Sequence, residues 1–252
     1  MTEDEKLPFT IHLEELRRRL ITAFAAVGVG FVASYAFKEK LFDILTAPLI
    51  SVMKPGETLI YTNLPEAFFT FLKAAFISGI MLASPVIIYQ FWMFIAPGLY
   101  QKEKRMLIPV VVLSTICFLG GALFGYFIVF PFGFKFFLGF ASETIRPLPS
   151  MKEYLSFSSK LLLAFGLVFE LPLVITFLAK LGIVSVEFLK KNRKYALLLF
   201  FAGAAILTPP DVITQVMMAM PMMLLYEISI LGARIFGKKK AETETEPEAA
   251  AD

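Results

Sequence analysis

The chain has 252 residues, of which 58% are hydrophobic and only 18% charged, and its mean hydropathy is +0.73. Soluble domains have about 45–50% apolar and about 25% charged residues, so this composition is typical of a helical protein that crosses the membrane several times. The net charge of +3 is not gathered into a basic stripe, so nucleic acid is not an expected partner. One cysteine and one histidine exclude a disulfide framework and most metal centres, so we expect no cofactor and no metal.

Six apolar segments follow one another along the chain. A helix rises about 1.5 Å per residue and must cross about 30 Å of hydrocarbon. We therefore expect an all-α integral membrane protein with spans over residues 20–37, 67–96, 107–138, 161–179, 195–207 and 212–231. The fifth span is only about 20 Å long because Pro209 and Pro210 end it, so we expect local thinning of the bilayer or shielding by neighbouring helices. The acid-rich stretch before Arg17 argues against a cleaved signal peptide.

Positive charge is distributed unevenly between the connecting segments. Of the 24 lysines and arginines, 15 fall in the segments 1–19, 97–106, 182–194 and 232–252, and only 5 in the alternate segments 38–66 and 139–158. The positive-inside rule then predicts that both termini are cytoplasmic. Residues 1–237 are expected to form one six-helix membrane domain. Residues 238–252 are charged and lack an apolar period, which predicts a disordered cytoplasmic tail.

The connection after the first span has a helical pattern of its own. Leu41, Ile44, Leu45 and Leu49 recur at helical spacing, and the pattern ends near Pro48. This spacing predicts an amphipathic helix that lies along the outer membrane surface.

Glu170 is the most conspicuous ionisable residue within an apolar segment. A carboxylate near the bilayer centre costs roughly 2.5–3.5 kcal/mol on insertion scales, so its side chain should face protein or water. It is interpreted as a proton site or as a polar anchor for another helix. The alternative is a local hydrogen bond to backbone groups that Pro172 leaves free. Gln215 and Glu227 are weaker cases, and Glu227 fits an interfacial position better than a functional one.

Carboxylates alternate with basic residues in two segments expected on the cytoplasmic side. Glu14 and Glu15 precede three arginines at 17–19, and Glu103 lies between Lys102 and Lys104. The charge pattern alone favours solvated helix ends with weak ion pairs. The alternative is that two of these carboxylates bind a cationic ligand, for which an arginine guanidinium has the best geometry. Signatures of phosphate-binding loops, zinc proteases and serine hydrolases do not occur, so we expect that the chain is not an enzyme.

Five motifs occur in order along the chain: HLEELRRR at 12–19, FIAPGLYQKEKR at 94–105, FGYFIVFP at 124–131, FGLVFELP at 165–172 and LTPPD at 207–211. With these motifs at six-span spacing, the sequence resembles the TatC family, the polytopic component of twin-arginine protein translocases. The resemblance implies a concave cup of six helices with short fifth and sixth spans, in the bacterial cytoplasmic (inner) membrane. It also implies binding of twin-arginine signal peptides of folded cargo proteins, whose export the proton-motive force drives.

The resemblance also assigns residues and partners. Signal-peptide binding is expected from Glu15, Leu16, Arg17, Leu99, Glu103 and Arg105. Thr208 and Gln215 are the polar candidates for contacts with the single-span partners TatA and TatB, and Glu170 would face the cup. Pro48 and Asp211 are expected in structural or functional loops. Membrane lipid and further copies of the chain are the remaining expected partners.

The residues, taken without the resemblance, are also compatible with two other functions. A proton-coupled transporter of small solutes would depend chiefly on Glu170, whereas a signal-peptide receptor would depend on Glu15 and Glu103. A passive scaffold would tolerate substitution of all three.

Overall fold

The computed structural model describes residues 3–95, 107–142, 144, 146–207 and 212–237. Within these residues the regular structure is helical, apart from one isolated β-bridge between Ile60 and Ser150. Four helical segments are long and apolar enough to cross a membrane: Glu66–Ile95, Leu107–Leu138, Met151–Lys180 and Val212–Phe236. A bent pair of helices at the N-terminal side could supply a fifth. The all-α membrane fold is thus confirmed, whereas the count of six spans and the orientation of the termini stay predictions.

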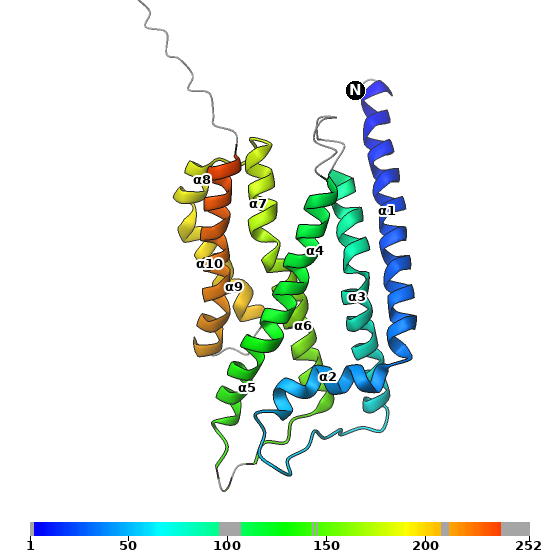
Figure 1. The fold of residues 1–252 in the computed structure, drawn as a ribbon, viewed down its shortest axis with the longest axis vertical. Helices are drawn as coiled ribbons and strands as arrows, with labels where there is room; N and C mark the ends of the chain where they lie inside the picture. The colour runs from blue at the N-terminus through cyan, green and yellow to red at the C-terminus, as the bar shows by residue number, and fades with distance from the viewer. Residues whose placement is uncertain (1–2, 96–106, 143, 145, 208–211, 238–252) are drawn as a thin grey trace, which may run out of the picture.

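The helices are, in chain order, α1 (Glu3–Tyr35), α2 (Lys38–Ile50), α3 (Glu66–Ile95), α4 (Leu107–Phe124), the π-helix η3 (Gly125–Val129), α5 (Phe130–Leu138), α6 (Met151–Phe169), α7 (Leu171–Lys180), α8 (Val186–Lys191), α9 (Arg193–Leu207) and α10 (Val212–Phe236). Figure 1 shows that α1 begins and α10 ends at the same end of the molecule, which we call the terminal end. The opposite end, where α2 lies across the foot of the molecule, is called the α2 end.

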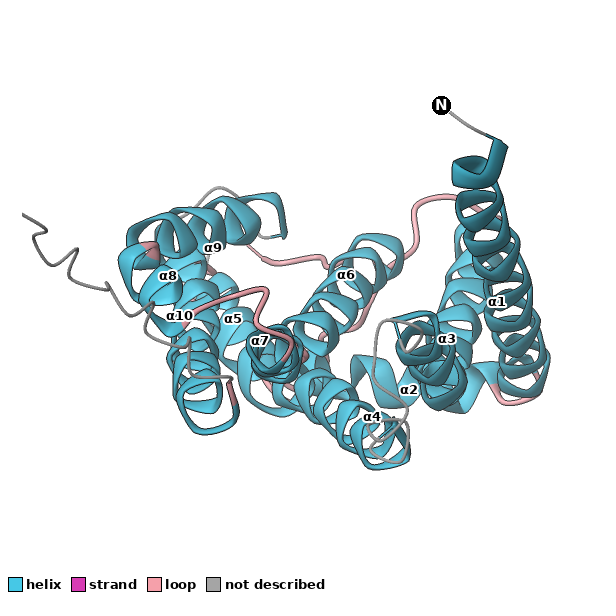
Figure 2. Cartoon of the chain, turned by 90° about the horizontal axis from the view of Figure 1, so that it is seen from above, coloured by secondary structure: helices cyan, strands magenta, loops and turns pink. Residues whose placement is uncertain are grey.

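The helices form an open layer rather than a closed bundle. Helix α1 packs on α3, α3 contacts α4 and α6, and α7 packs on α10, which also contacts α9. Seen from above, α1 and α3 lie at one side of the layer and α8, α9 and α10 at the other (Figure 2). This open arrangement agrees with the cup expected from the resemblance.

Helices α1 and α3 cross at two glycines. A Cβ atom on Gly30 would collide with the backbone of Gly79, and a Cβ atom on Gly79 would collide with the backbone of Gly30 and Phe31. Gly28, one half-turn away, has nothing within 4 Å of such an atom. The close approach of the two backbones therefore requires glycine at 30 and 79 but not at 28.

Helix α2 confirms the helix expected around 41–49, and it meets α1 at an angle of 91°. Pro48 was expected in a loop, but it is buried within the last turns of α2. A proline there has no N–H for the carbonyl of Ile44. The hydroxyl of Tyr126 donates to that carbonyl at 2.6 Å. The hydroxyl of Tyr154 donates to the next carbonyl, that of Leu45, also at 2.6 Å.

Two spans differ in length from those expected. The fourth begins at Met151 rather than at 161, because Ser150 accepts a hydrogen bond from the backbone N–H of Glu153 and caps α6. It is also divided at Glu170, which ends α6 and precedes α7. The sixth was expected to be short, but α10 has 25 residues and continues to Phe236 in spite of Pro221 within it. The fifth is short as expected, with 15 residues in α9.

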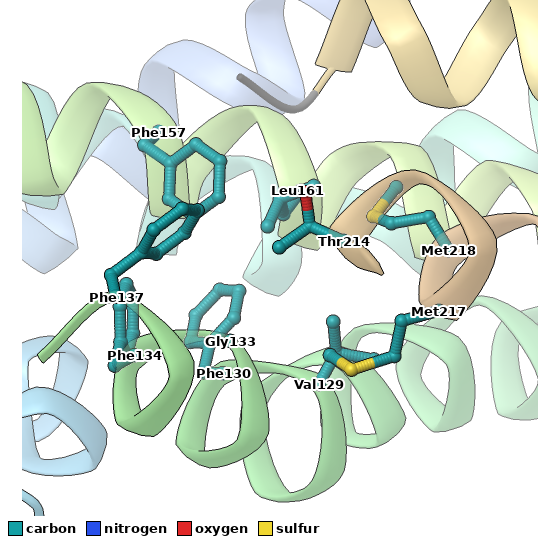
Figure 3. A pocket seen from close by; sticks show the side chains of 10 residues that line it. All are labelled: Val129, Phe130, Gly133, Phe134, Phe137, Phe157, Leu161, Thr214, Met217 and Met218. Atoms are coloured by element: carbon teal, nitrogen blue, oxygen red, sulfur yellow. The ribbon is translucent and has the colours of Figure 1, made fainter. Parts of the chain in front are cut away.

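Aromatic side chains fill the core between α5, α6 and α10. Phe130 and Phe165 are almost completely buried, and Phe134 packs against both Phe130 and Tyr154. Figure 3 shows the side chains around a small gap between these helices, with Met217 and Met218 of α10 on one side. The gap holds about 10 Å³, which is enough for at most one water molecule. This region is therefore packed core and not a ligand site.

Candidate functional sites at the terminal end and in the helix layer

Glu15 lies near the terminal end of α1 and is held by an arginine one turn further along. Both Nε and Nη2 of Arg19 donate to Oε1 of Glu15, the first at 3.0 Å. Arg19 also donates from Nη1 to Oε1 of Gln90 on α3, at 3.5 Å. The Glu15 side chain is about 29% exposed. Glu15 is therefore fixed in orientation from two helices and remains accessible to a ligand.

The second carboxylate oxygen of Glu15 is on the side of His12. Nδ1 of His12 lies 3.9 Å from Oε2 of Glu15, beyond hydrogen-bond range. The His12 ring stacks on Phe94, with 4.4 Å between ring centroids, which places the end of α3 beside Glu15. Leu16 is partly buried and Arg17 is exposed. Arg19 bonds Oε1 alone, so Oε2 presents lone pairs on this side.

Glu170 is part of a hydrogen-bonded chain that joins three segments. Nε1 of Trp92 on α3 donates to Oγ of Ser114 on α4 at 2.7 Å, and Oγ of Ser114 donates to Oε2 of Glu170 at 2.8 Å. Ser114 and Trp92 are buried, with 0% and 2% exposure. Oε1 of Glu170 is buried and has no hydrogen-bond partner among the described residues. This arrangement favours the interpretation of Glu170 as a polar anchor between helices.

An apolar cavity of about 420 Å³ opens beside these hydrogen-bonded residues, between α4, α7 and α10. Trp92, Cys117, Pro172 and Lys180 are among the residues that line it. Its walls are almost entirely hydrocarbon, so the cavity suits an apolar group and not a charged one.

Gln215 and Glu227 both lie on α10 and both connect it to other parts of the chain. Nε2 of Gln215 donates to the backbone oxygen of Phe201 on α9 at 2.9 Å. Oε2 of Glu227 accepts from Nη2 of Arg193 at 2.7 Å, and both side chains are about half exposed. The Gln215 amide thus already has a structural role within the α9–α10 pair.

Five of the expected site residues lie outside the described residues: Leu99, Glu103, Arg105, Thr208 and Asp211. The structure brings Glu15 and Leu16 to the neighbourhood of the α3 end and places Arg17 on the exposed side of α1. Their expected roles in binding stay predictions.

Several polar contacts in these sites were not predicted. The Glu15–Arg19 pair has the i, i+4 spacing of a helical ion pair, so it could have been found from the sequence. The bond from Arg19 to Gln90 joins residues that are 71 positions apart. The Trp92–Ser114 and Ser114–Glu170 bonds join residues that are 22 and 56 positions apart. No local pattern predicts pairs at such separations.

The open layer of long apolar helices, with charged residues at the terminal end and a polar chain inside, defines a polytopic membrane protein. A family model described as "Sec-independent protein translocase protein (TatC)" matches residues 11–221. The chain belongs to this family.

Known relatives match over almost the whole length. The chain is 67% identical over 244 residues to the Sec-independent protein translocase protein TatC of Desulforapulum autotrophicum, covering 97% of this chain and 90% of that protein. It is 39% identical over 244 residues to the TatC protein of Escherichia coli K12, covering 97% and 95%. A crystal structure of the twin arginine translocase receptor TatC matches with a TM-score of 0.81 and 44% identity, covering 89% of this chain and 98% of that one.

Proposed function

We propose that this chain is the component of a twin-arginine translocase that binds the signal peptides of folded cargo on the cytoplasmic side. The solved relative is described as a twin arginine translocase receptor. The observation that supports the same role here is the state of Glu15, which is anchored by Arg19 through Oε1 alone while its side chain stays 29% exposed. A carboxylate fixed in this way is prepared to accept a guanidinium group of a signal peptide.

Glu103 is the proposed second carboxylate of this site. It precedes the first residue of α4, Leu107, by four positions, and an extended chain spans at most about 3.6 Å per residue. Phe94, which touches His12, precedes the same segment. These two bounds on the chain are compatible with a binding site that Glu103 shares with Glu15. Leu16 and Leu99 would then contact apolar parts of the peptide, while Arg17 and Arg105 would orient the two carboxylates.

The partner subunits are proposed at the α9–α10 side. Single-span subunits such as TatA and TatB would pack there, with Thr208 and the carbonyl group of Gln215 as polar contacts. The short α9 supports this placement, because a helix of 15 residues leaves part of the bilayer thickness to be covered by another protein or by a thinned membrane. The proposed location is the bacterial inner membrane, the energy source is the proton-motive force, and several copies act in one complex.

The experiment is a binding titration of the full chain in detergent with a twin-arginine signal peptide and its twin-lysine variant. Glu15→Gln and Glu103→Gln are expected to weaken binding of the twin-arginine peptide by roughly 10- to 100-fold each, as for loss of a charge-assisted hydrogen bond. Glu14→Gln is the matched control, because Glu14 is the adjacent carboxylate and is exposed. The control should bind as the wild type does.

Equal binding of the two peptides by the wild type would contradict recognition by paired carboxylates. An equal effect of the Glu14→Gln and Glu15→Gln variants would show that net charge, and not the position of Glu15, governs binding. Solute transport that depends on Glu170 and persists without both cytoplasmic carboxylates would support a proton-coupled transporter instead.

A further inference from the structure

A second polar region lies at the α2 end, far from Glu15. It is a hollow of about 710 Å³, which we call the basic hollow, between the start of α3 and the start of α6. The residues that line it include two lysines, Lys73 and Lys152, the hydroxyl residues Thr62, Thr70 and Ser156, and the apolar Phe69 and Leu155. The basic hollow therefore combines two ammonium groups, three hydroxyl groups and an apolar wall.

The one carboxylate in the basic hollow is already satisfied from within the protein. Oε2 of Glu66 accepts from the backbone N–H and the hydroxyl of Thr62, at 2.8 and 3.0 Å. Oε1 accepts from the hydroxyl of Ser150 at 2.7 Å and from the backbone N–H of Lys152 at 3.2 Å. Glu66 is only 5% exposed. Its charge is thus spread over four donors, and it does not form a salt bridge with either lysine within the described structure.

The two lysines keep donors for a ligand. Nζ of Lys73 donates to the hydroxyl of Ser156 at 2.9 Å, which uses one of its three N–H groups. The Lys152 side chain is exposed. Because the two come from different helices and border one cavity, an anion placed between them would satisfy both.

The depth of the basic hollow indicates which anion reaches it. Lys73 follows the start of α3 by seven residues, or about 10 Å along the helix axis, so it lies near the membrane interface rather than at its centre. Phe68 and Phe69, just before it, are 54% and 62% exposed. An amphipathic ligand with a phosphate on the lysines and hydrocarbon on the phenylalanines fits this surface.

We propose that the basic hollow binds the headgroup of an anionic phospholipid, with its phosphate between Lys73 and Lys152 and an acyl chain along Phe69. A zwitterionic lipid carries its own ammonium group, which would repel the two lysines. The site therefore selects phosphatidylglycerol over phosphatidylcholine. The bound lipid joins α3 to α6 at the end of the molecule opposite the proposed peptide site.

The test uses the delipidated full chain in detergent, titrated with spin-labelled phosphatidylglycerol or phosphatidylcholine of the same acyl chains. Each lysine is expected to raise the affinity for the anionic lipid about fivefold, so the wild type should prefer phosphatidylglycerol by roughly 20-fold. Lys73→Met and Lys152→Met should each lower that preference about fivefold. Lys152→Arg should retain it. Lys40→Met is the matched control, since Lys40 is an exposed lysine at the same end that does not border the hollow.

Three results would overturn the proposal. The first is equal affinity of the wild type for the two lipids. The second is a loss in Lys40→Met as large as in Lys152→Met, which would show a diffuse charge effect. The third is displacement of the lipid by inorganic phosphate at equal concentration, which would show a site for free phosphate. Lys152 has an exposed side chain, so its variants test binding without disturbing the fold.

Discussion

The hydroxyl of Tyr126 donates to the carbonyl of Ile44, which is the backbone group that Pro48 leaves without a helical partner. The tyrosine comes from the π-helix η3, 82 residues further along the chain. A side chain of one segment thus replaces a hydrogen bond missing from another. This replacement explains how a proline can be buried inside α2 without an unsatisfied carbonyl.

The Tyr126–Pro48 relationship gives a double-mutant prediction. Tyr126→Phe should lower the free energy of unfolding by about 0.5–1.5 kcal/mol, because it removes the hydrogen bond to the Ile44 carbonyl. In a Pro48→Ala background the same change should cost much less, since the substituted alanine supplies the missing backbone N–H. Thermal or chemical unfolding in detergent measures both costs. Equal costs in the two backgrounds would contradict the compensation.

The Trp92–Ser114–Glu170 chain predicts a spectroscopic effect. Trp92 is the single tryptophan of the chain, so its fluorescence reports on this site alone. Ser114→Ala removes the acceptor of the indole N–H, and the emission should move to shorter wavelength. Stability should fall by about 1–3 kcal/mol, because polar groups of two residues lose partners.

Ser229→Ala is the control for this prediction. Ser229 is another fully buried serine, but its hydroxyl donates to the carbonyl of Leu225 in its own helix at 2.7 Å. Its removal should leave the emission of Trp92 unchanged. An unshifted spectrum in the Ser114→Ala variant would show that the indole N–H has another partner.

The crossing of α1 and α3 predicts different effects for two neighbouring glycines. Gly30→Ala should lower stability by about 1–3 kcal/mol, because the added methyl group meets the backbone of Gly79 and forces the helices apart. Gly28→Ala meets nothing and should be neutral or stabilise α1 by up to about 1 kcal/mol. Unfolding temperatures of the two variants, measured side by side, check this. Similar losses in both would argue against a close contact at Gly30.

The hydrogen bonds of Glu66 are expected to hold two connecting segments together. Its carboxylate bonds Thr62 before α3 and Ser150 before α6, beside the bridge between Ile60 and Ser150. In Glu66→Gln one oxygen is replaced by an NH₂ group, which cannot accept from these donors. Limited proteolysis after Lys54 should therefore become faster. Glu153→Gln, an exposed carboxylate at the start of α6, is the control and should be cleaved at the wild-type rate.

The sequence predicted those features that depend on local periodicity. The apolar spacing of Leu41, Ile44 and Leu45 correctly indicated α2, and the two prolines after Leu207 correctly indicated a short α9. The beginning of α6 was placed too late because its first turns are polar, and apolar content alone does not reveal an N-cap such as Ser150.

Tertiary contacts account for what could not be predicted. Pro48 looked like a loop residue because a proline usually ends a helix, and only Tyr126 explains why α2 continues past it. Glu170 was correctly singled out as a carboxylate within an apolar span, but its partner Ser114 is an ordinary serine in the sequence. Glu15 was expected from the motif, whereas its connection to Gln90 through Arg19 requires α1 and α3 to be packed side by side.

The corner between α1 and α2 contains only two residues that are not helical. Helix α1 ends at Tyr35 and α2 begins at Lys38, so Ala36 and Phe37 alone connect two helices that meet at 91°. Hydroxyl groups from η3 and α6 donate to the backbone of α2 and so connect it to both segments. Any change in the angle between α1 and α2 must therefore be accommodated by the backbone torsions of Ala36 and Phe37.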